Sequence, residues 1–183
     1  EVARRARAFG MTIVGFDPLV AEEKARELGV ELDSLKGVLK RADFLTLHAA
    51  LTPDTRHLLN AAAFAAMKKG VRIVNCARGA LVDEAALAAA IKDGKVAGAA
   101  LDVFETEPPA RDNPLLGLDA VVVTPHLGAS TEEAQTNVAR VVAEQVRDYL
   151  LQGVVKNAVN YKIKRRRSKC CAASFTSFVK KRR

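Results

Sequence analysis

The chain has 183 residues, of which 49% are apolar, enough for one good hydrophobic core. Its net charge of +8 comes from its end: residues 161–183 hold ten Lys and Arg and no acid, whereas residues 1–160 hold 19 basic and 21 acidic residues. No apolar run approaches the ~18 residues of a membrane-spanning helix, and three cysteines, two of them adjacent, fit neither a disulfide framework nor a metal site. The composition predicts a near-neutral globular body with a basic tail.

Helical and strand patterns alternate along the first 151 residues. Apolar residues at helical spacing, several bounded by capping residues or glycine, predict helices over 2–9, 22–28, 34–41, 61–69, 83–92 and 130–151. Short apolar runs predict strands over 11–16, 30–32, 43–48, 71–75, 96–103 and 121–124. Strands that alternate with helices form βαβ units, so the predicted fold is α/β, a Rossmann-like doubly wound parallel sheet followed by one long helix.

Two of the predicted strands carry little or no polar alternation. The segments VRIVN (71–75) and AVVV (120–123) are apolar runs of the kind found in strands buried on both faces. Both strands are therefore expected to be buried on both faces.

The last helix has a clear start, because Ser130 or Thr131 can cap it and Glu132 and Glu133 suit the dipole of its first turn.

Polar side chains follow five of the predicted strands. They are Asp17, His48, Arg78, Asp102 with Glu107 just beyond it, and His126. Because the carboxyl ends of parallel strands meet at one edge of a sheet, where open α/β sheets bind ligands, these residues are expected to form one site.

Arg78 follows the strand VRIVN. An arginine at the ligand edge can bind a carboxylate through two parallel hydrogen bonds. The alternative is a surface arginine paired with Asp83 or Glu84, and position alone does not separate the two. The other strand ends favour the carboxylate clamp.

Asp17 ends the first strand, which follows a helix. In a dinucleotide-binding fold an acid at this place accepts hydrogen bonds from the adenosine ribose and favours NAD over NADP. The alternative is a turn residue before Pro18. The usual accompanying Gly-x-Gly-x-x-Gly loop would lie before Val2 and is not in this sequence.

His126 lies between a strand and a glycine-containing turn, where an imidazole can transfer a proton near neutral pH. A carboxylate such as Glu107 against that ring would orient it and favour its protonated form. The alternatives are a capping histidine and a solvated loop acid. With Arg78 as the clamp, the set suits hydride transfer between a cofactor and a 2-oxo acid.

Three further residues are given lesser roles. His48 is interpreted as part of a loop that skirts a bound cofactor, not as an acid–base group, and His57 as a surface residue. Cys76 is expected to contact the cofactor through its backbone, with no reactive thiolate.

The sequence resembles the D-isomer-specific 2-hydroxyacid dehydrogenases over roughly residues 1–160. The matching segments are LTPDT (51–55), MKKGVRIVNCARGALVDEAAL (67–87), ALDVFETEPP (100–109) and VVVTPHLGASTEEAQ (121–135). The segment PHLGAST (125–131) resembles that of the branch that acts on 3-phosphoglycerate. Glyoxylate and hydroxypyruvate reductases more often have a segment that resembles PHIGSAT at this place.

The resemblance implies NAD-dependent oxidation of 3-phosphoglycerate to 3-phosphohydroxypyruvate, the first step of serine synthesis. It implies that Arg78 holds the substrate carboxylate, that His126 is the general acid/base and that Glu107 is its partner. Ala49 stands where many relatives have threonine. The residues implied to border the cofactor are Asp17, Ala49, Cys76, Ala77, Arg78, Asp102, His126 and Gly128.

The resemblance also divides the chain. Residues 1–129 are expected to form an incomplete NAD-binding domain, 130–160 a crossover helix toward a substrate domain, and 161–183 a disordered basic tail. Because the family's first strand and glycine loop are not in the sequence, we expect this chain alone to bind NAD poorly. The apolar face of the long helix, which includes Val138, Val142 and Val146, would need another surface.

Other readings of the whole chain are a non-catalytic NAD-binding corepressor and another 2-hydroxyacid dehydrogenase, such as a glyoxylate or hydroxypyruvate reductase. The expected partners are a small 2-hydroxy acid and a second copy of the chain, with no membrane. Nucleic acid is not expected, because the tail holds no nucleic-acid module. The default location is the cytoplasm, and a plastid is the alternative if a transit peptide has been removed.

Overall fold

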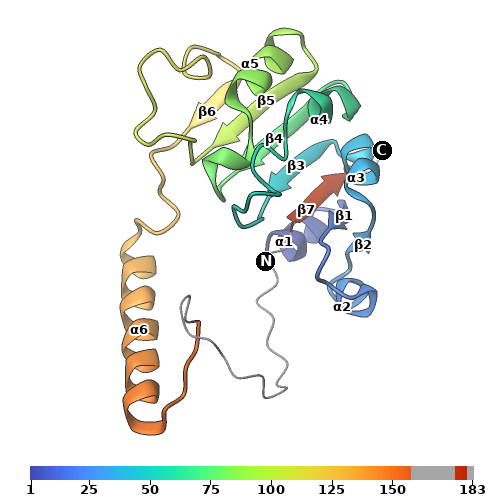
Figure 1. Cartoon of the computed structure of the whole chain (residues 1–183). Helices are drawn as coiled ribbons and strands as arrows, with labels where there is room; N and C mark the ends of the chain where they lie inside the picture. The colour runs from blue at the N-terminus through green and yellow to red at the C-terminus, as the bar shows by residue number, and fades with distance from the viewer. Residues whose placement is uncertain (158–175, 181–183) are drawn as a thin grey trace. The chain divides into compact units, whose positions relative to one another are not determined.

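The computed structural model describes residues 1–157 and 176–180 (Figure 1). The chain forms two compact units. The first consists of Glu1–Pro125 together with the strand Thr176–Lys180, and the second begins at His126 and contains the long helix. Each unit is described by itself.

The helices and strands alternate as the sequence predicts. The helices are α1 (Val2–Ala8), α2 (Glu22–Glu27), α3 (Leu35–Arg41), α4 (Ala61–Ala66), α5 (Glu84–Lys92) and α6 (Glu132–Gln152), with one 3₁₀ turn, η1 (Gly79–Leu81). The strands are β1 (Thr12–Phe16), β2 (Glu31–Leu32), β3 (Phe44–Leu47), β4 (Val71–Asn75), β5 (Val96–Leu101), β6 (Val121–Val123) and β7 (Thr176–Lys180).

Side-chain caps fix where several helices begin. The side chains of Ser34, Asn60, Asp83 and Thr131 each accept a hydrogen bond from a backbone N–H in the first turn of α3, α4, α5 and α6. These bonds satisfy donors that have no partner within the helix. Of the two predicted caps for α6, Thr131 is the one that forms, with the N–H of Ala134 at 3.1 Å.

The described strands form one sheet in the order β2-β1-β7-β3-β4-β5-β6. All neighbouring pairs are parallel except those of β7, which runs antiparallel to both β1 and β3. From β2 to β5 this is the 3-2-1-4-5-6 order of a doubly wound dinucleotide-binding sheet, with β7 in the central place of strand 1, and β6 adds one further strand at the edge. The α/β Rossmann-like prediction is confirmed, but the sheet is mixed because of this one reversed strand.

Of the tail over 161–183 that the sequence predicts to be disordered, the structure describes only β7. Residues 176–180 form a strand, and the rest of that range lies outside the described residues. The physical reason is the gap between β1 and β3, whose facing edges both present backbone N–H and C=O groups that need partners. β7 supplies them, with Phe178 in register with both Val14 and Leu45.

Hydrophobic residues pack on both faces of the sheet. Adjacent residues of β1 show this, because side chains alternate between the faces of a strand. Ile13 belongs to a cluster with Ala25 and Val30, beneath α1 and α2. Val14 belongs to the larger cluster, which includes Phe64 of α4 and Leu87 of α5. This arrangement leaves the carboxyl edge of the sheet for the loops.

The prediction that both apolar strands are buried on both faces is wrong for β6. Val122 and Val123 are exposed, because β6 is the edge strand and no helix follows it among the described residues of the first unit. In β4 the residues Val71 and Ile73 are buried, whereas Arg72 is exposed and lies over the ring of Phe44, 5.6 Å from its centre.

The second unit contains α6, a helix of 21 residues that ends at Gly153 in a left-handed conformation. The predicted apolar face is exposed, and its residues include Val138, Val142 and Val146. Near its end, the buried carboxylate of Asp148 pairs with Arg147 and Lys156. Neither α6 nor any other helix of the described residues is long and apolar enough to cross a membrane.

Candidate active site

The residues predicted from the strand ends of the first unit do lie at one edge of the sheet. Asp17 directly follows β1, His48 follows β3, and Asp102 follows β5. Because these strands are parallel, their carboxyl ends share an edge. The reversed strand β7 instead brings its amino end to this edge, where Thr176 is in register with Phe16.

A pocket of about 550 Å³ opens between the loops that follow β3 and β4. Its lining residues are His48, Ala49, Ala50, Leu51, Cys76, Ala77 and Arg78. The structure thus brings together four residues that the sequence predicted for the cofactor site, Ala49, Cys76, Ala77 and Arg78.

The side chain of Asn75 shapes the loop that carries Arg78. Asn75 is buried at the end of β4, where its Nδ2 donates to the carbonyl of Arg78 at 2.9 Å and its Oδ1 accepts from the N–H of Ala77 at 3.0 Å. Both ends of the loop are therefore tied to one amide. The Arg78 side chain is exposed and donates only locally, to the carbonyl of Ala77 at 2.6 Å.

The alternative partners for Arg78 are engaged elsewhere. Asp83 caps α5 by accepting from the N–H of Ala86 at 3.0 Å, and Glu84 accepts from the N–H of Glu105 at 2.7 Å. Within the described part of the chain, Arg78 forms no ion pair with either acid. Its guanidinium is thus available to an external carboxylate.

Asp17 has one satisfied and one unsatisfied carboxylate oxygen. The residue is 8% exposed, and its Oδ1 accepts from the N–H of Leu19 at 2.8 Å. Its Oδ2 is buried and has no hydrogen-bond partner among the described residues. A buried acceptor without a donor is costly, so the position suits a ligand hydroxyl that donates to it.

Asp102 lies in the interior beside the Cys76 loop. It is 7% exposed, accepts from the hydroxyl of Thr124, and is linked through its own N–H to the carbonyl of Asn75 at 3.0 Å. Cys76 is exposed, but partial desolvation, and after it the negative charge of Asp102, raises the pKa of its thiol. The thiol therefore stays protonated near neutral pH, as expected for a residue without a reactive thiolate.

His48 forms part of the pocket wall. Its Nε2 lies 3.1 Å from the hydroxyl of Thr46, and burial lowers the pKa of its imidazole. Burial thus favours the neutral form of His48, and its role in a loop beside a cofactor stays a prediction.

Glu107 lies in a loop that packs against the Arg78–Gly79 step. Its Oε1 accepts from the N–H of Phe104 at 3.0 Å. A Cβ atom on Gly79 would meet the backbone of Phe104 at 1.9 Å and the nitrogen of Glu105 at 2.4 Å, so only glycine permits this approach. The Glu107 loop and the Arg78 loop are therefore in direct backbone contact.

His126 and Gly128 belong to the second unit. His126 has a left-handed backbone conformation with φ of 55°, and its carbonyl accepts from the hydroxyl of Ser130 at 3.4 Å. The predicted pairing of His126 with Glu107 stays a prediction.

A contact that the sequence did not reveal joins Arg56 and His57 to Glu105. The carboxylate of Glu105 pairs with both side chains, although 49 and 48 residues separate them in the sequence. Its backbone is in turn held by Glu84, which also accepts from the side chain of Asn113 at 2.6 Å. The left-handed conformation of His57 and this long separation leave no local pattern that could have indicated the contact.

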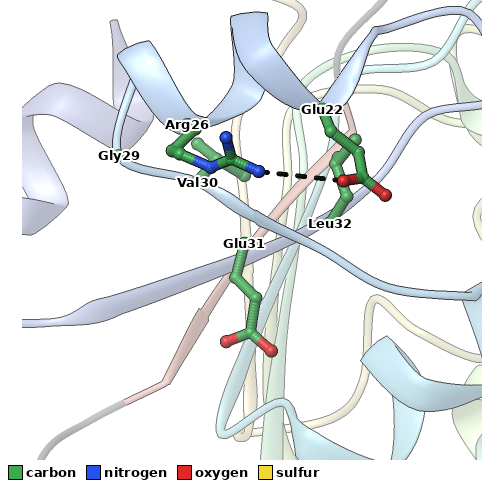
Figure 2. A pocket seen from close by; sticks show the side chains of 6 residues that line it. All are labelled: Glu22, Arg26, Gly29, Val30, Glu31 and Leu32. Atoms are coloured by element: carbon green, nitrogen blue, oxygen red, sulfur yellow. Dashed lines mark ion pairs between the residues drawn. The ribbon is translucent and has the colours of Figure 1, made fainter.

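A second pocket, of about 430 Å³, lies between α2 and β2 (Figure 2). Its lining includes Glu22, Arg26 and Glu31, and the Arg26–Glu22 ion pair along α2 measures 3.8 Å. None of the residues predicted for the site lines it. The described residues also include no group of three or more His, Cys, Asp or Glu that could hold a metal ion.

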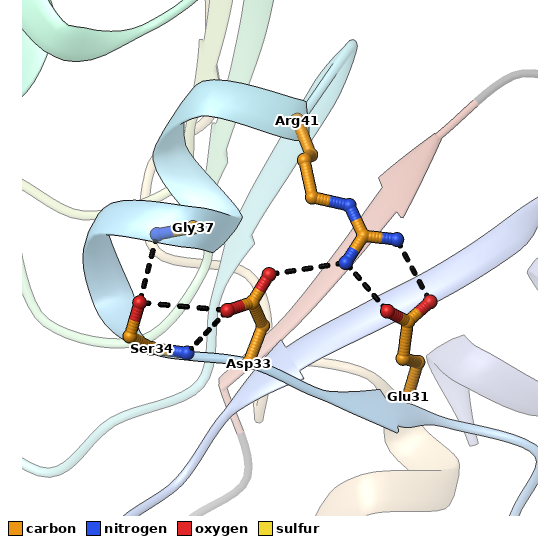
Figure 3. Close-up of polar contacts among 5 residues, drawn as sticks. All are labelled: Glu31, Asp33, Ser34, Gly37 and Arg41. Atoms are coloured by element: carbon orange, nitrogen blue, oxygen red, sulfur yellow. Dashed lines mark hydrogen bonds and ion pairs between the residues drawn. The ribbon is translucent and has the colours of Figure 1, made fainter.

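Glu31, which lines that pocket, also belongs to an ion-pair network (Figure 3). Arg41 donates to both oxygens of Glu31, at 2.6 and 2.7 Å, and to Asp33 at 3.0 Å. Asp33 also accepts from the N–H of Ser34 at 2.7 Å. This network joins β2 to α3.

The sheet order, the acid after β1 and the pocket at the carboxyl edge define a dinucleotide-binding α/β domain of the dehydrogenase type. Comparison with known families agrees: residues 1–128 match the model of the D-isomer specific 2-hydroxyacid dehydrogenase NAD binding domain. The chain belongs to this family.

Similar proteins include a D-3-phosphoglycerate dehydrogenase of Methanocaldococcus jannaschii, 55% identical over 87% of this chain and 30% of that protein. Among solved structures, a glyoxylate reductase from Paecilomyes thermophila is 39% identical, with a TM-score of 0.81, over 87% of this chain and 48% of that one. A D-lactate dehydrogenase from Aquifex aeolicus, complexed with NAD and lactic acid, is 34% identical with a TM-score of 0.72, over 81% and 49%. The chain thus spans about a third of the length of the curated relative and half that of the structures.

Proposed function

We propose that this chain is the cofactor-binding part of an NAD-dependent dehydrogenase that oxidises 3-phosphoglycerate to 3-phosphohydroxypyruvate. The observation that carries the proposal is the pocket at the carboxyl edge, where the exposed Arg78 has no carboxylate partner among the described residues. The high identity to a protein named D-3-phosphoglycerate dehydrogenase supports the choice of substrate.

The carboxylate of Asp17 fits a nicotinamide dinucleotide, whereas the glycine-rich turn that such a cofactor needs is lacking among the described residues. The buried, unpaired Oδ2 of Asp17 would accept a hydrogen bond from a ribose hydroxyl. The glycine-rich turn that cradles the pyrophosphate normally follows the carboxyl end of the central strand. Because β7 is reversed, no such turn follows the central strand at this edge among the described residues. We therefore propose that this chain binds NAD, but weakly.

The other residues predicted for the cofactor site are proposed to border it. In the proposal Ala49, Cys76, Ala77 and Asp102 do so from the first unit, and Gly128 from the second. Bound NAD would supply the hydride acceptor for the carbon that bears the hydroxyl group.

The protein side chains supply binding and proton transfer. Arg78 would hold the carboxylate of the substrate through two parallel hydrogen bonds. His126 would accept the proton of the 2-hydroxyl group as general base, and Glu107 would orient its ring and stabilise the imidazolium form. These roles rest on the family resemblance and on the position of Arg78 in the pocket.

Two further parts of the proposal concern assembly and location. A second copy of the chain is proposed as a partner, by resemblance to the family, and sedimentation of the purified chain would test it. The cytoplasm is the proposed location, with a plastid as the alternative that localisation of a tagged chain would distinguish.

The substrate is tested by measuring NADH formation from NAD with 3-phosphoglycerate, glycolate and D-lactate in parallel. The proposal expects turnover with 3-phosphoglycerate to exceed that with the other two acids. It also expects His126→Ala to lose roughly 10²–10⁴ of the rate, as for a general acid/base. Faster turnover of glycolate, or an active His126→Ala variant, would contradict it.

A further inference from the structure

One carboxylate ties together two loops at the carboxyl edge of the sheet. Glu105 lies in the loop after β5, and Arg56 and His57 lie in the loop between β3 and α4. The guanidinium of Arg56 pairs with one oxygen of Glu105, and Nε2 of His57 lies 3.1 Å from the other. The Glu105 side chain is 31% exposed, and those of His57 and Arg56 are 36% and 54% exposed, so the contact lies at the surface of the unit.

The backbone at His57 shows that this loop is held in an unfavourable conformation. His57 has φ of 51°, in the left-handed region, which is unfavourable for a residue with a side chain. The chain keeps this conformation while it runs alongside η1: the N–H of His57 donates to Ala80 at 2.8 Å and that of Leu59 to Leu81 at 3.0 Å. Surrounding contacts must therefore hold the loop in place.

Glu105 itself is anchored from the opposite side. Its N–H donates to Glu84 at 2.7 Å, and its nitrogen lies against Gly79, next to Arg78. The main chain of Glu105 is thus fixed to the Arg78 loop, while its side chain holds Arg56 and His57.

The loop held in this way leads into the wall of the pocket. Ala50 and Leu51 line the pocket opposite Cys76 and Arg78. The hydroxyl of Thr55 donates to the carbonyl of Ala50 at 2.7 Å, which links this wall to the residues beside Arg56. Movement of Arg56 and His57 would therefore reach the wall.

We propose that Glu105 is a positioning residue that holds the 50–58 loop against the Arg78 loop and so sets the width of the pocket. What the pocket receives, a carboxylate substrate and its cofactor, rests on the proposed function. The contact between the loops does not.

The test uses the full chain with Cys170 and Cys171 changed to serine, so that Cys76 is the only thiol. Glu105→Gln keeps the shape of the side chain and removes its charge. The matched control is Asp43→Asn, which weakens the Lys68–Asp43 ion pair at 2.7 Å, where the aspartate side chain is similarly exposed at 33%. Two signals are measured: hydrogen exchange of the His57 and Leu59 amides, and the rate at which a thiol reagent labels Cys76.

We expect the exchange rates of the two amides to rise at least about fivefold in Glu105→Gln, a change of about 1 kcal/mol in local opening. The labelling rate of the exposed Cys76 should rise as the pocket widens, and both rates should stay unchanged in Asp43→Asn. An unchanged exchange rate, an unchanged labelling rate, or equal increases in the control would each overturn the proposal. Equal free energies of unfolding for the two variants would establish that the opening is local.

Enzyme kinetics separate this proposal from the proposed function. If the parent chain turns over 3-phosphoglycerate, Glu105→Gln should raise KM severalfold with a smaller change in kcat, and an unchanged KM would overturn the positioning role. If the parent shows no turnover, that result counts against the proposed function, and the exchange and labelling rates still decide whether Glu105 sets the pocket.

Discussion

Gly79 is the residue on which the geometry of the Arg78 loop depends most directly. Its neighbour Arg78 lines the pocket, and its own backbone touches that of Phe104 and Glu105. Since a Cβ atom would lie only 1.9 Å from the Phe104 backbone, no rotation of a side chain can relieve the clash. The closeness of the two loops is therefore a property of this one glycine.

Replacing Gly79 with alanine should destabilise the chain by about 1–3 kcal/mol, the usual cost of overpacking a buried contact. Gly117→Ala is the matched control, because a Cβ there meets nothing within 4 Å and its φ is not in the left-handed region. Urea unfolding should place the control within about 0.5 kcal/mol of the parent. Equal losses in the two variants would show that the Gly79 contact is not as close as described.

The residues of the site could be predicted only in part from the sequence. The positions of Asp17, Arg78 and Asp102 at one edge could be predicted because each directly or closely follows an apolar strand, and parallel strands end at one edge. Glu105 and its partners were not found, because their contact joins residues 48 and 49 apart and depends on how two loops meet. Sequence periodicity reports neighbours within an element, not contacts between loops.

At the level of elements, β2 is a strand of two residues at the edge of the sheet, and it is joined to α3 by charged groups (Figure 3). The hydrogen bond from Arg41, followed by that from the N–H of Ser34, lowers the pKa of Asp33 below its ordinary value of 3.8. A short edge strand has few ladder bonds of its own. We therefore expect this network to help keep β2 in place.

The contribution of Asp33 to the free energy of unfolding should decrease as the pH falls. Because the pKa of Asp33 is lower in the folded chain than in the unfolded one, its contribution is present above about pH 4 and is lost as the pH falls through the folded-state pKa. The advantage of the parent over Arg41→Gln in free energy of unfolding should thus shrink between about pH 4 and about pH 2.

Urea unfolding at a series of pH values would measure this difference. Arg26→Gln, which removes the looser 3.8 Å contact with Glu22, is the control and should differ less from the parent at every pH. A difference between parent and Arg41→Gln that stays constant down to pH 2 would rule out the network as its source.

At the scale of the whole sheet, the first six strands could be predicted from the sequence and β7 could not. The six strands are apolar runs between helices, so local pattern identifies them. Residues 176–180 lie in a segment rich in Lys and Arg, and what places them is the gap between the unpaired edges of β1 and β3. That gap exists only once the rest of the sheet has formed.

β7 should therefore be required to join the two halves of the sheet. β1 and β3 do not pair with each other in the described sheet, and Phe178 is in register with both of them. Phe178→Pro removes a backbone donor in the middle of this strand and should cost roughly 1–3 kcal/mol. Phe178→Ala keeps the backbone N–H. The difference between the two variants in free energy of unfolding, measured in urea, therefore gives the contribution of that backbone hydrogen bond. Equal stabilities would mean that β7 does not hold the halves together.

The central claim is that NAD binds along the carboxyl edge of this sheet, weakly because its central strand is reversed. The most direct test is an NADH titration of the ¹⁵N-labelled chain followed by NMR. The account predicts shifts at the amides of Leu19 and of Cys76 to Arg78, with a dissociation constant nearer ~1 mM than ~1 μM, and about tenfold weaker binding in Asp17→Asn, which keeps the acceptor for Leu19. Micromolar affinity, no effect of Asp17→Asn, or shifts confined to the pocket of Glu22 and Arg26 would contradict it.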